Sequence, residues 1–114
     1  MKHSNNTKLG VVLPSRGLLF SKTLEELLRE LKPYNYKIYF SHARPIPDCF
    51  NIPTKQALED PEITHILFCE DDMCLPNGVL KKMIDLDVPA TALDYPFKND
   101  DEATILHDPQ GYAL

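Results

Sequence analysis

Three consecutive carboxylates, Glu70, Asp71 and Asp72, directly follow the most apolar stretch of the chain, residues 66–69. That stretch does not alternate with polar residues, which predicts a strand buried on both faces. The carboxylates would then lie at the carboxyl edge of a sheet, where open α/β folds bind ligands. Adjacent carboxylates repel one another unless a cation neutralises them, and oxygen ligands suit Mg²⁺ or Mn²⁺. The pattern predicts a divalent metal or ligand site, and a solvated acidic turn that continues into residues 76–78 is the simpler alternative.

The composition limits the classes of protein to consider. A chain of 114 residues is long enough for one domain with a core. The formal charge is −5 and the basic residues are not clustered, which argues against nucleic acid as a main partner. No apolar run approaches the roughly 18 residues of a membrane span, and residues 1–8 lack the apolar core of a signal peptide. We therefore expect a cytoplasmic protein whose odd number of cysteines stay reduced; they are Cys49, Cys69 and Cys74.

The spacing of apolar residues predicts four strands that alternate with three helices. Short apolar runs give the strands, whereas leucines three and four residues apart give the first helix its apolar face. Thr23 and Glu26 form a predicted capping box for that helix, and Asn77 is the predicted cap of the third. The predicted strands are residues 9–13, 36–41, 66–69 and 88–95. The first predicted helix ends before Pro33, the second runs from Asn51 or Ile52 to Glu59, and the third follows Asn77.

This alternation predicts the fold class and the domain organisation. Strands that alternate with helices form a mainly parallel sheet with right-handed crossovers and helices on both faces, a Rossmann-like α/β architecture. We expect a flexible N-terminus at residues 1–8, an α/β domain at residues 9–96 and a polar, incomplete tail at residues 97–114. A sheet of this kind normally receives further strands. We therefore expect an exposed sheet edge or apolar patch, and a homo-oligomer that covers it.

The residues around the acidic triplet resemble those of a known enzyme family. An apolar strand that runs into Glu70-Asp71-Asp72, then Pro76 and an amphipathic helix, resembles the D-x-D motif of glycosyltransferases with the GT-A fold. The likeness is greatest to the family-two-like enzymes of bacteria and phages. Their first strand typically ends in proline, a polar residue and Asn or Arg, and Pro14-Ser15-Arg16 is similar. The resemblance covers roughly residues 9–95 and implies a GT-A core.

Three departures from the family pattern accompany this resemblance. The second strand of the family ends in an Asp that helps to read uracil, whereas this chain has Ser41-His42-Ala43-Arg44 there. Phe50 stands where the family has an Arg before Asn51. Family members are also considerably longer, and their C-terminal half supplies the acceptor site and the catalytic base of inverting members. The resemblance therefore implies a fragment or a minimal, truncated relative, and it leaves the catalytic residue open.

The resemblance also implies roles for particular residues in the transfer of a sugar from a UDP- or GDP-sugar. Asp72 would bind Mn²⁺ or Mg²⁺ directly, and Asp71 would support the turn. Glu70 would bind the ribose or a metal-bound water, and it is counted with Asp72 as a metal-site residue. Arg16 would pair with the diphosphate. Two alternatives stay open: a non-catalytic nucleotide-sugar-binding module, and a small interaction domain with a solvated acidic edge. The remaining predicted nucleotide- or sugar-binding residues are Ser15, Arg44 and Asp94.

Overall fold

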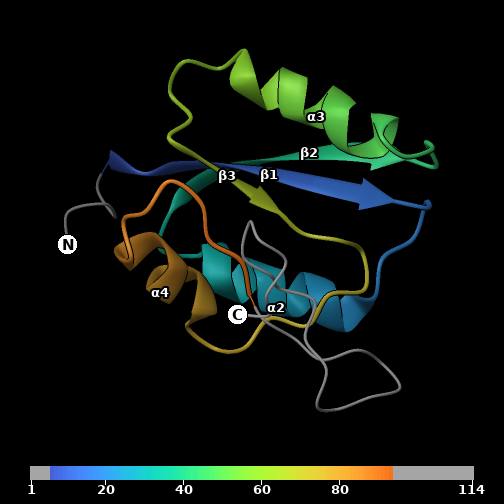
Figure 1. Ribbon diagram of the computed structural model, residues 1–114. Coiled ribbons are helices and arrows are strands. Elements are labelled where there is room, and N and C mark those ends of the chain that lie inside the picture. Colours follow the sequence, from blue (N-terminus) through green and yellow to red (C-terminus); the bar gives the residue numbers. More distant parts are fainter. Residues whose placement is uncertain (1–5, 94–114) are drawn as a thin grey trace, which may run out of the picture.

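The computed structural model describes residues 6–93, which form a three-stranded parallel sheet between two layers of helices (Figure 1). The sheet has the order β2-β1-β3, with β1 (Lys8–Ser15) paired in parallel to both of its neighbours. β2 is Asn35–His42 and β3 is His65–Phe68. The predicted parallel α/β sheet is therefore confirmed for its first three strands. No helix within residues 6–93 is long and apolar enough to cross a membrane.

The helices cover both faces of the sheet, as the alternation predicts. Helix α3 (Asp48–Leu58) lies on one face, whereas α2 (Ser21–Leu31) and α4 (Val79–Asp85) lie on the other (Figure 1). The alternate side chains of β1 serve both layers because a strand points successive residues to opposite faces. Leu9, Val11 and Leu13 join the core on the side of α2 and α4, which also contains Leu27 and Leu31 of α2.

On the opposite face, β1 and α3 approach closely at Gly10. A Cβ atom at this position would lie 2.9 Å from Cδ1 of Ile63 and 3.1 Å from Cβ of Ala57. These distances are shorter than ordinary van der Waals contacts, so a glycine at this position allows the helix and the following loop to pack against the strand.

Helix α2 begins two residues before the predicted capping box, so that prediction was wrong. Its N-cap is Phe20, which supplies no side-chain hydrogen bond. Thr23 lies inside the helix and is buried. The carboxylate of Glu26 instead accepts the backbone N–H of Leu75 at 2.9 Å, across 49 residues of sequence. A residue pattern typical of a local cap therefore takes part in a tertiary contact.

The predicted cap of α4 at Asn77 was also wrong. The N-cap is Gly78, whose φ of 81° is in the left-handed region that favours glycine, and no side chain of the cap itself bonds to the helix. Glu30 of α2 supplies the acceptors: its two carboxylate oxygens accept the N–H groups of Gly78 and Leu80, each at 3.0 Å. Arg29 donates to Glu30 at 3.0 Å and to the carbonyl oxygen of Leu75 at 2.6 Å. Helix α2 thus caps the N-terminus of α4.

Helix α3 begins at Asp48, three residues before the earlier of its two predicted starts. Pro53 therefore lies inside the helix and is buried, although the prediction placed it in the first turn. Proline has no N–H, so it cannot donate to the carbonyl of Cys49 four residues earlier. The hydroxyl of Ser41, in β2, donates to that carbonyl at 2.6 Å and replaces the missing hydrogen bond.

The predicted fourth strand is not formed over residues 88–93, which are in no strand or helix. Pro89 cannot donate a ladder hydrogen bond, and Val88 beside it is exposed. β3 is therefore at an edge of the sheet that the structure describes, which explains why Phe68 is exposed although its strand was predicted to be buried on both faces. Residues 94–95 of the predicted strand, and the tail from residue 97, lie outside the described residues.

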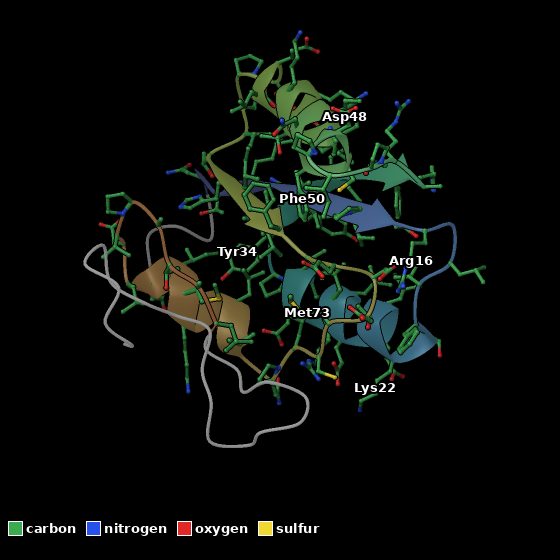
Figure 2. The ribbon with its side chains drawn as sticks, turned by 45° about the vertical axis from the view of Figure 1, so that its right-hand side comes forward. Arg16, Lys22, Tyr34, Asp48, Phe50 and Met73 are labelled. Carbon is green, nitrogen blue, oxygen red and sulfur yellow. The ribbon has the colours of Figure 1, made fainter. Side chains whose placement is uncertain are left out.

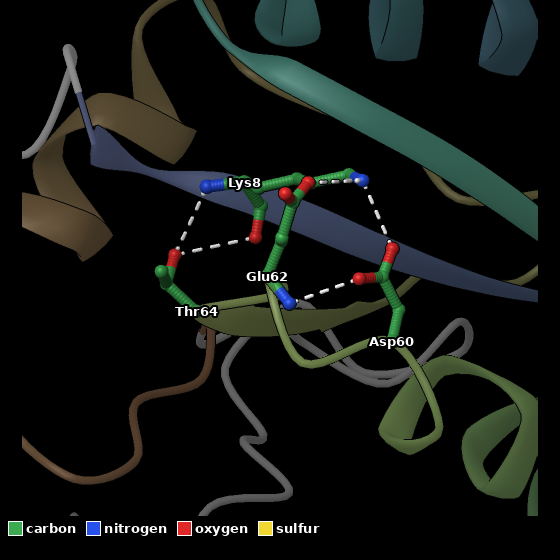
Figure 3. A network of polar contacts seen from close by, with 4 residues as sticks. All are labelled: Lys8, Asp60, Glu62 and Thr64. Atoms are coloured by element: carbon green, nitrogen blue, oxygen red, sulfur yellow. Dashed lines mark hydrogen bonds and ion pairs between the residues drawn. The ribbon is translucent and has the colours of Figure 1, made fainter.

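A polar network joins the start of β1 to the segment that leads into β3 (Figure 3). The Lys8 ammonium contacts Asp60 at 2.9 Å and Glu62 at 3.4 Å. The Lys8 backbone N–H donates to the Thr64 hydroxyl at 3.0 Å, and the Thr64 N–H donates back to the Lys8 carbonyl at 2.9 Å. The hydrogen bond from Lys8 lowers the pKa of Asp60 below its ordinary value. This network fixes β1 and β3 together at the amino edge of the sheet.

Candidate functional site

The parallel register carries the ends of β1 and β3 to the same edge of the sheet. Val12 pairs with Phe68, and the N–H of Cys69 extends the ladder by donating to the carbonyl of Val12 at 3.0 Å. Beyond their last paired residues, the two strands diverge: β1 leads into the loop to α2, and β3 leads into the loop to α4. Arg16 begins the first loop and the acidic triplet begins the second, so the predicted neighbours do meet at the carboxyl edge.

The three carboxylates of the triplet lie in different environments. Asp71 is only 6% exposed, whereas Glu70 and Asp72 on either side are exposed. The N–H of Met73 donates to the carbonyl of Glu70 at 3.4 Å and closes a turn. Two carboxylates that are separated by one residue are therefore presented to solvent, and the carboxylate between them points inward.

The buried Asp71 joins the two loops through three hydrogen bonds. One of its carboxylate oxygens accepts the backbone N–H of Arg16 at 3.3 Å, and the other accepts Nη2 of the Arg16 guanidinium at 3.3 Å. Its backbone carbonyl accepts the N–H of Phe20 at 3.0 Å. Figure 2 shows Arg16 on the loop that leaves β1 toward α2. These contacts fix both ends of the β1–α2 loop to the middle residue of the triplet.

The hydroxyl of Ser15 is used within the turn that follows β1. It accepts the N–H of Gly17 at 3.0 Å and donates to the carbonyl of Leu18 at 3.1 Å. Gly17 has a φ of 115°, which favours glycine, and so permits the turn. The carbonyl of Ser15 accepts the N–H of Ala43 at 2.7 Å, which brings the loop after β2 to the same edge. Ser15 therefore shapes the edge, and its one hydroxyl proton is already donated.

The other predicted binding residues are less closely tied to the triplet. Arg44 is exposed on the loop between β2 and α3. Asp94 lies outside the described residues. An aromatic pair that was not predicted, Phe50 and Phe68, lies near the same edge, with ring centroids 6.3 Å apart in an edge-on arrangement. Phe50 belongs to the first turn of α3, and this position could be recognised only after the start of that helix was known.

The thiol of Cys69 is buried beneath the triplet. Burial first, and the carboxylates of Glu70 and Asp72 in addition, raise the pKa of this thiol to about 11. The thiol therefore stays protonated at neutral pH, and it has the character of a small apolar core residue, as the sequence suggests.

No group of three or more His, Cys, Asp or Glu side chains within residues 6–93 lies close enough together to hold a metal ion. Glu70 and Asp72 supply two exposed carboxylates, and the Mg²⁺ or Mn²⁺ site stays a prediction. A separate pocket of about 570 Å³ lies on the α4 side of β3 and is lined mainly by apolar residues, among them Ile66, Val79 and Met83. It contains none of the three carboxylates.

Comparisons of this chain with protein-family models, with curated proteins and with solved structures gave no match. The carboxyl edge of the sheet is therefore the feature from which a function can be inferred.

Proposed function

We propose that this chain is a GT-A-like nucleotide-sugar-binding domain that holds a UDP- or GDP-sugar through Mn²⁺ or Mg²⁺ at Glu70 and Asp72, for transfer of the sugar to an acceptor. The observation that carries the proposal is the alternation within the triplet. Glu70 and Asp72 are exposed at the carboxyl edge, and Asp71 between them is buried. The resemblance to a D-x-D motif implies the same division, with the metal and the ribose assigned to Glu70 and Asp72 and only support of the turn assigned to Asp71.

The residues at this edge suit the metal that the proposal requires. Mg²⁺ and Mn²⁺ prefer carboxylate oxygens and often take only one or two of them, with water and substrate phosphates completing the shell. Glu70 and Asp72 would hold the ion, which when bound supplies Lewis-acid stabilisation of the leaving diphosphate. Arg16 would contact the diphosphate oxygens, because a guanidinium gives charge-assisted and bidentate hydrogen bonds.

The position of the site in the sheet also supports the proposal. The chain runs from β1 to β2 on one side and then crosses to β3 on the other, so the strand order reverses around β1. Ligands of open α/β sheets usually bind at the carboxyl edge beside such a reversal. The loop after β1 and the loop after β3, which carry Arg16 and the triplet, flank this position.

The test is calorimetric titration of UDP and of GDP, each with and without Mn²⁺. A carboxylate pair repels free diphosphate and holds a hydrated ion weakly, so metal and nucleotide should bind cooperatively, with Mn²⁺ tightening nucleotide binding about 10-fold or more. Asp72→Asn removes one charge with little change of shape and should abolish this coupling. Glu59→Gln removes a carboxylate at the end of α3 and serves as the matched control, with coupling unchanged.

The outcomes separate the proposal from its alternatives. Nucleotide binding that ignores both Mn²⁺ and Asp72→Asn would refute the metal site. Metal-dependent binding without turnover of any UDP- or GDP-sugar would assign the non-catalytic nucleotide-sugar-binding module. Absence of nucleotide binding would favour an interaction domain with a solvated acidic edge.

A further inference from the structure

We propose that Asp71 is a positioning residue, which fixes Arg16 beside Glu70 and Asp72 so that one cation and two carboxylates face a metal-bound diphosphate in a preset arrangement. This inference is based on the proposed function and adds to it a residue that touches neither metal nor nucleotide. The observation that carries it is a buried carboxylate shared between two loops that are 55 residues apart in sequence.

The contacts of Asp71 define both loops at once. Its side chain is 9% exposed, and its two oxygens bind the backbone N–H and the guanidinium of Arg16. A buried carboxylate is costly unless it is paired and hydrogen-bonded, so these contacts hold the side chain in place. The bond from Phe20 N–H to the Asp71 carbonyl fixes the backbone of the same residue. With the side chain of Asp71 turned inward, its neighbours on either side are directed outward.

The Arg16 side chain is held by one contact and is otherwise exposed to solvent. Its side chain is 79% exposed, and Nη2 is the guanidinium atom that contacts Asp71. An exposed arginine normally loses much side-chain freedom when it binds an anion. A guanidinium that is already held at one end gives up less of that freedom, so its affinity for a diphosphate is higher than that of a free arginine. Asp71 would therefore act on the nucleotide through Arg16.

The experiment is a double-mutant cycle on the full chain, with Asp71→Asn, Arg16→Gln and the double variant. Asp71→Asn keeps an oxygen for the Arg16 N–H and loses the charge that pairs with the guanidinium. Calorimetric titration of UDP in Mn²⁺ should give each single variant an affinity about 10-fold below the wild type, the size typical of residues that orient a metal or its ligands. Because both residues act through one contact, the double variant should be no weaker than the worse single variant.

Controls separate positioning from a general effect on folding. Circular dichroism at the assay temperature checks that each variant is folded. A purely structural role for Asp71 would lower the thermal midpoint and leave the UDP affinity of the folded protein unchanged. If Asp71→Asn does not fold, Asp71→Glu replaces it in the cycle, because the longer side chain displaces the guanidinium while keeping the charge.

The possible failures are distinguishable. Wild-type protein without metal-dependent UDP binding would overturn the proposed function and this inference together. Wild-type binding with unchanged affinity in Asp71→Asn, or with losses that add up in the double variant, would overturn this inference alone.

Discussion

Asp71 and its two neighbours have nearly the same chemistry and differ in burial. A carboxylate in water is free to bind any cation, whereas one enclosed by hydrogen-bond donors already has its partners. Asp71 has Arg16 as its partner, and Glu70 and Asp72 are exposed. The position of each residue in the turn therefore sets its environment: the middle carboxylate joins the two loops, and the outer two are exposed to solvent.

Glu30 is a second buried carboxylate with a structural role, and it leads to a prediction on pH. Burial by itself would raise its pKa, but the N–H groups of Leu80 and Gly78 and the guanidinium of Arg29 lower it below 4.5. Glu30→Gln removes the charge that these donors face and should destabilise the fold by about 2 kcal/mol at pH 7. Thermal unfolding of both proteins measures the difference.

The sign of the pH effect follows from the lowered pKa. The ordinary pKa of Glu30, taken for the unfolded chain, is 4.5, and above this pH the stabilisation from Glu30 is fully present. The stabilisation is lost as the pH falls through the lower pKa that Glu30 has in the folded state. The thermal midpoints of wild type and Glu30→Gln should therefore converge as the pH falls below 4.5. Glu25→Gln, an exposed change in the same helix, is the control. A difference between the two thermal midpoints that does not narrow at any pH below 4.5 would contradict the assignment.

At the scale of elements, Pro53 and Ser41 form a coupled pair. The proline leaves the carbonyl of Cys49 without its helical donor, and the buried hydroxyl of Ser41 replaces that donor at 2.6 Å. Ser41→Ala leaves a buried carbonyl unpaired and should cost about 1–3 kcal/mol of stability in urea unfolding.

A double-mutant cycle tests this pairing. Pro53→Ala restores an N–H that can donate to Cys49, so Ser41→Ala should cost less in that background than in the wild type. The same cost in both backgrounds would show that the hydroxyl stabilises the fold in some other way.

The sequence predicted the elements better than their ends. Continuous apolar runs marked β1 and β3, and alternation with helices implied their parallel pairing, because both signals are local. The predicted starts of α2 and α4 were wrong because Glu26 and Glu30 form hydrogen bonds with a segment that is distant in sequence. The prediction of a fourth strand was wrong over residues 88–93, because the apolar run there includes Pro89, which has no N–H to donate to a neighbouring strand.

The candidate site was predictable to a similar degree. The apolar strand placed the acidic triplet at the carboxyl edge, and the end of the first strand placed Arg16 at the same edge. The pairing of Arg16 with Asp71, and the burial of the middle carboxylate, depend on how two loops fit together in space. No local pattern carries that information, so the resemblance assigned Arg16 to the diphosphate and Asp71 to the turn without linking the two residues.

At the scale of the whole molecule, one side of the sheet exposes apolar groups from two elements. Tyr36 and Phe40 of β2 pair with Leu9 and Leu13 of β1 and therefore point to the α2 side. Both aromatic residues are exposed, and so are Leu24 and Leu28 on α2. We call these four residues the α2–β2 strip. β2 is also an edge strand of the described sheet, and an apolar surface beside an open edge favours association of protein chains.

We therefore expect the protein to associate with itself through the α2–β2 strip, and Leu28→Glu to weaken this association. A charge in the strip would have to be buried in the interface, whereas in the monomer Leu28 is 42% exposed and tolerates a helix-favouring Glu. Leu58→Glu is the matched control, because Leu58 is exposed at the end of α3 on the opposite face. Sedimentation velocity over a concentration series should show association for wild type and Leu58→Glu and a monomer for Leu28→Glu. A wild type that stays monomeric at every concentration, or equal effects of the two substitutions, would rule out the strip as the interface.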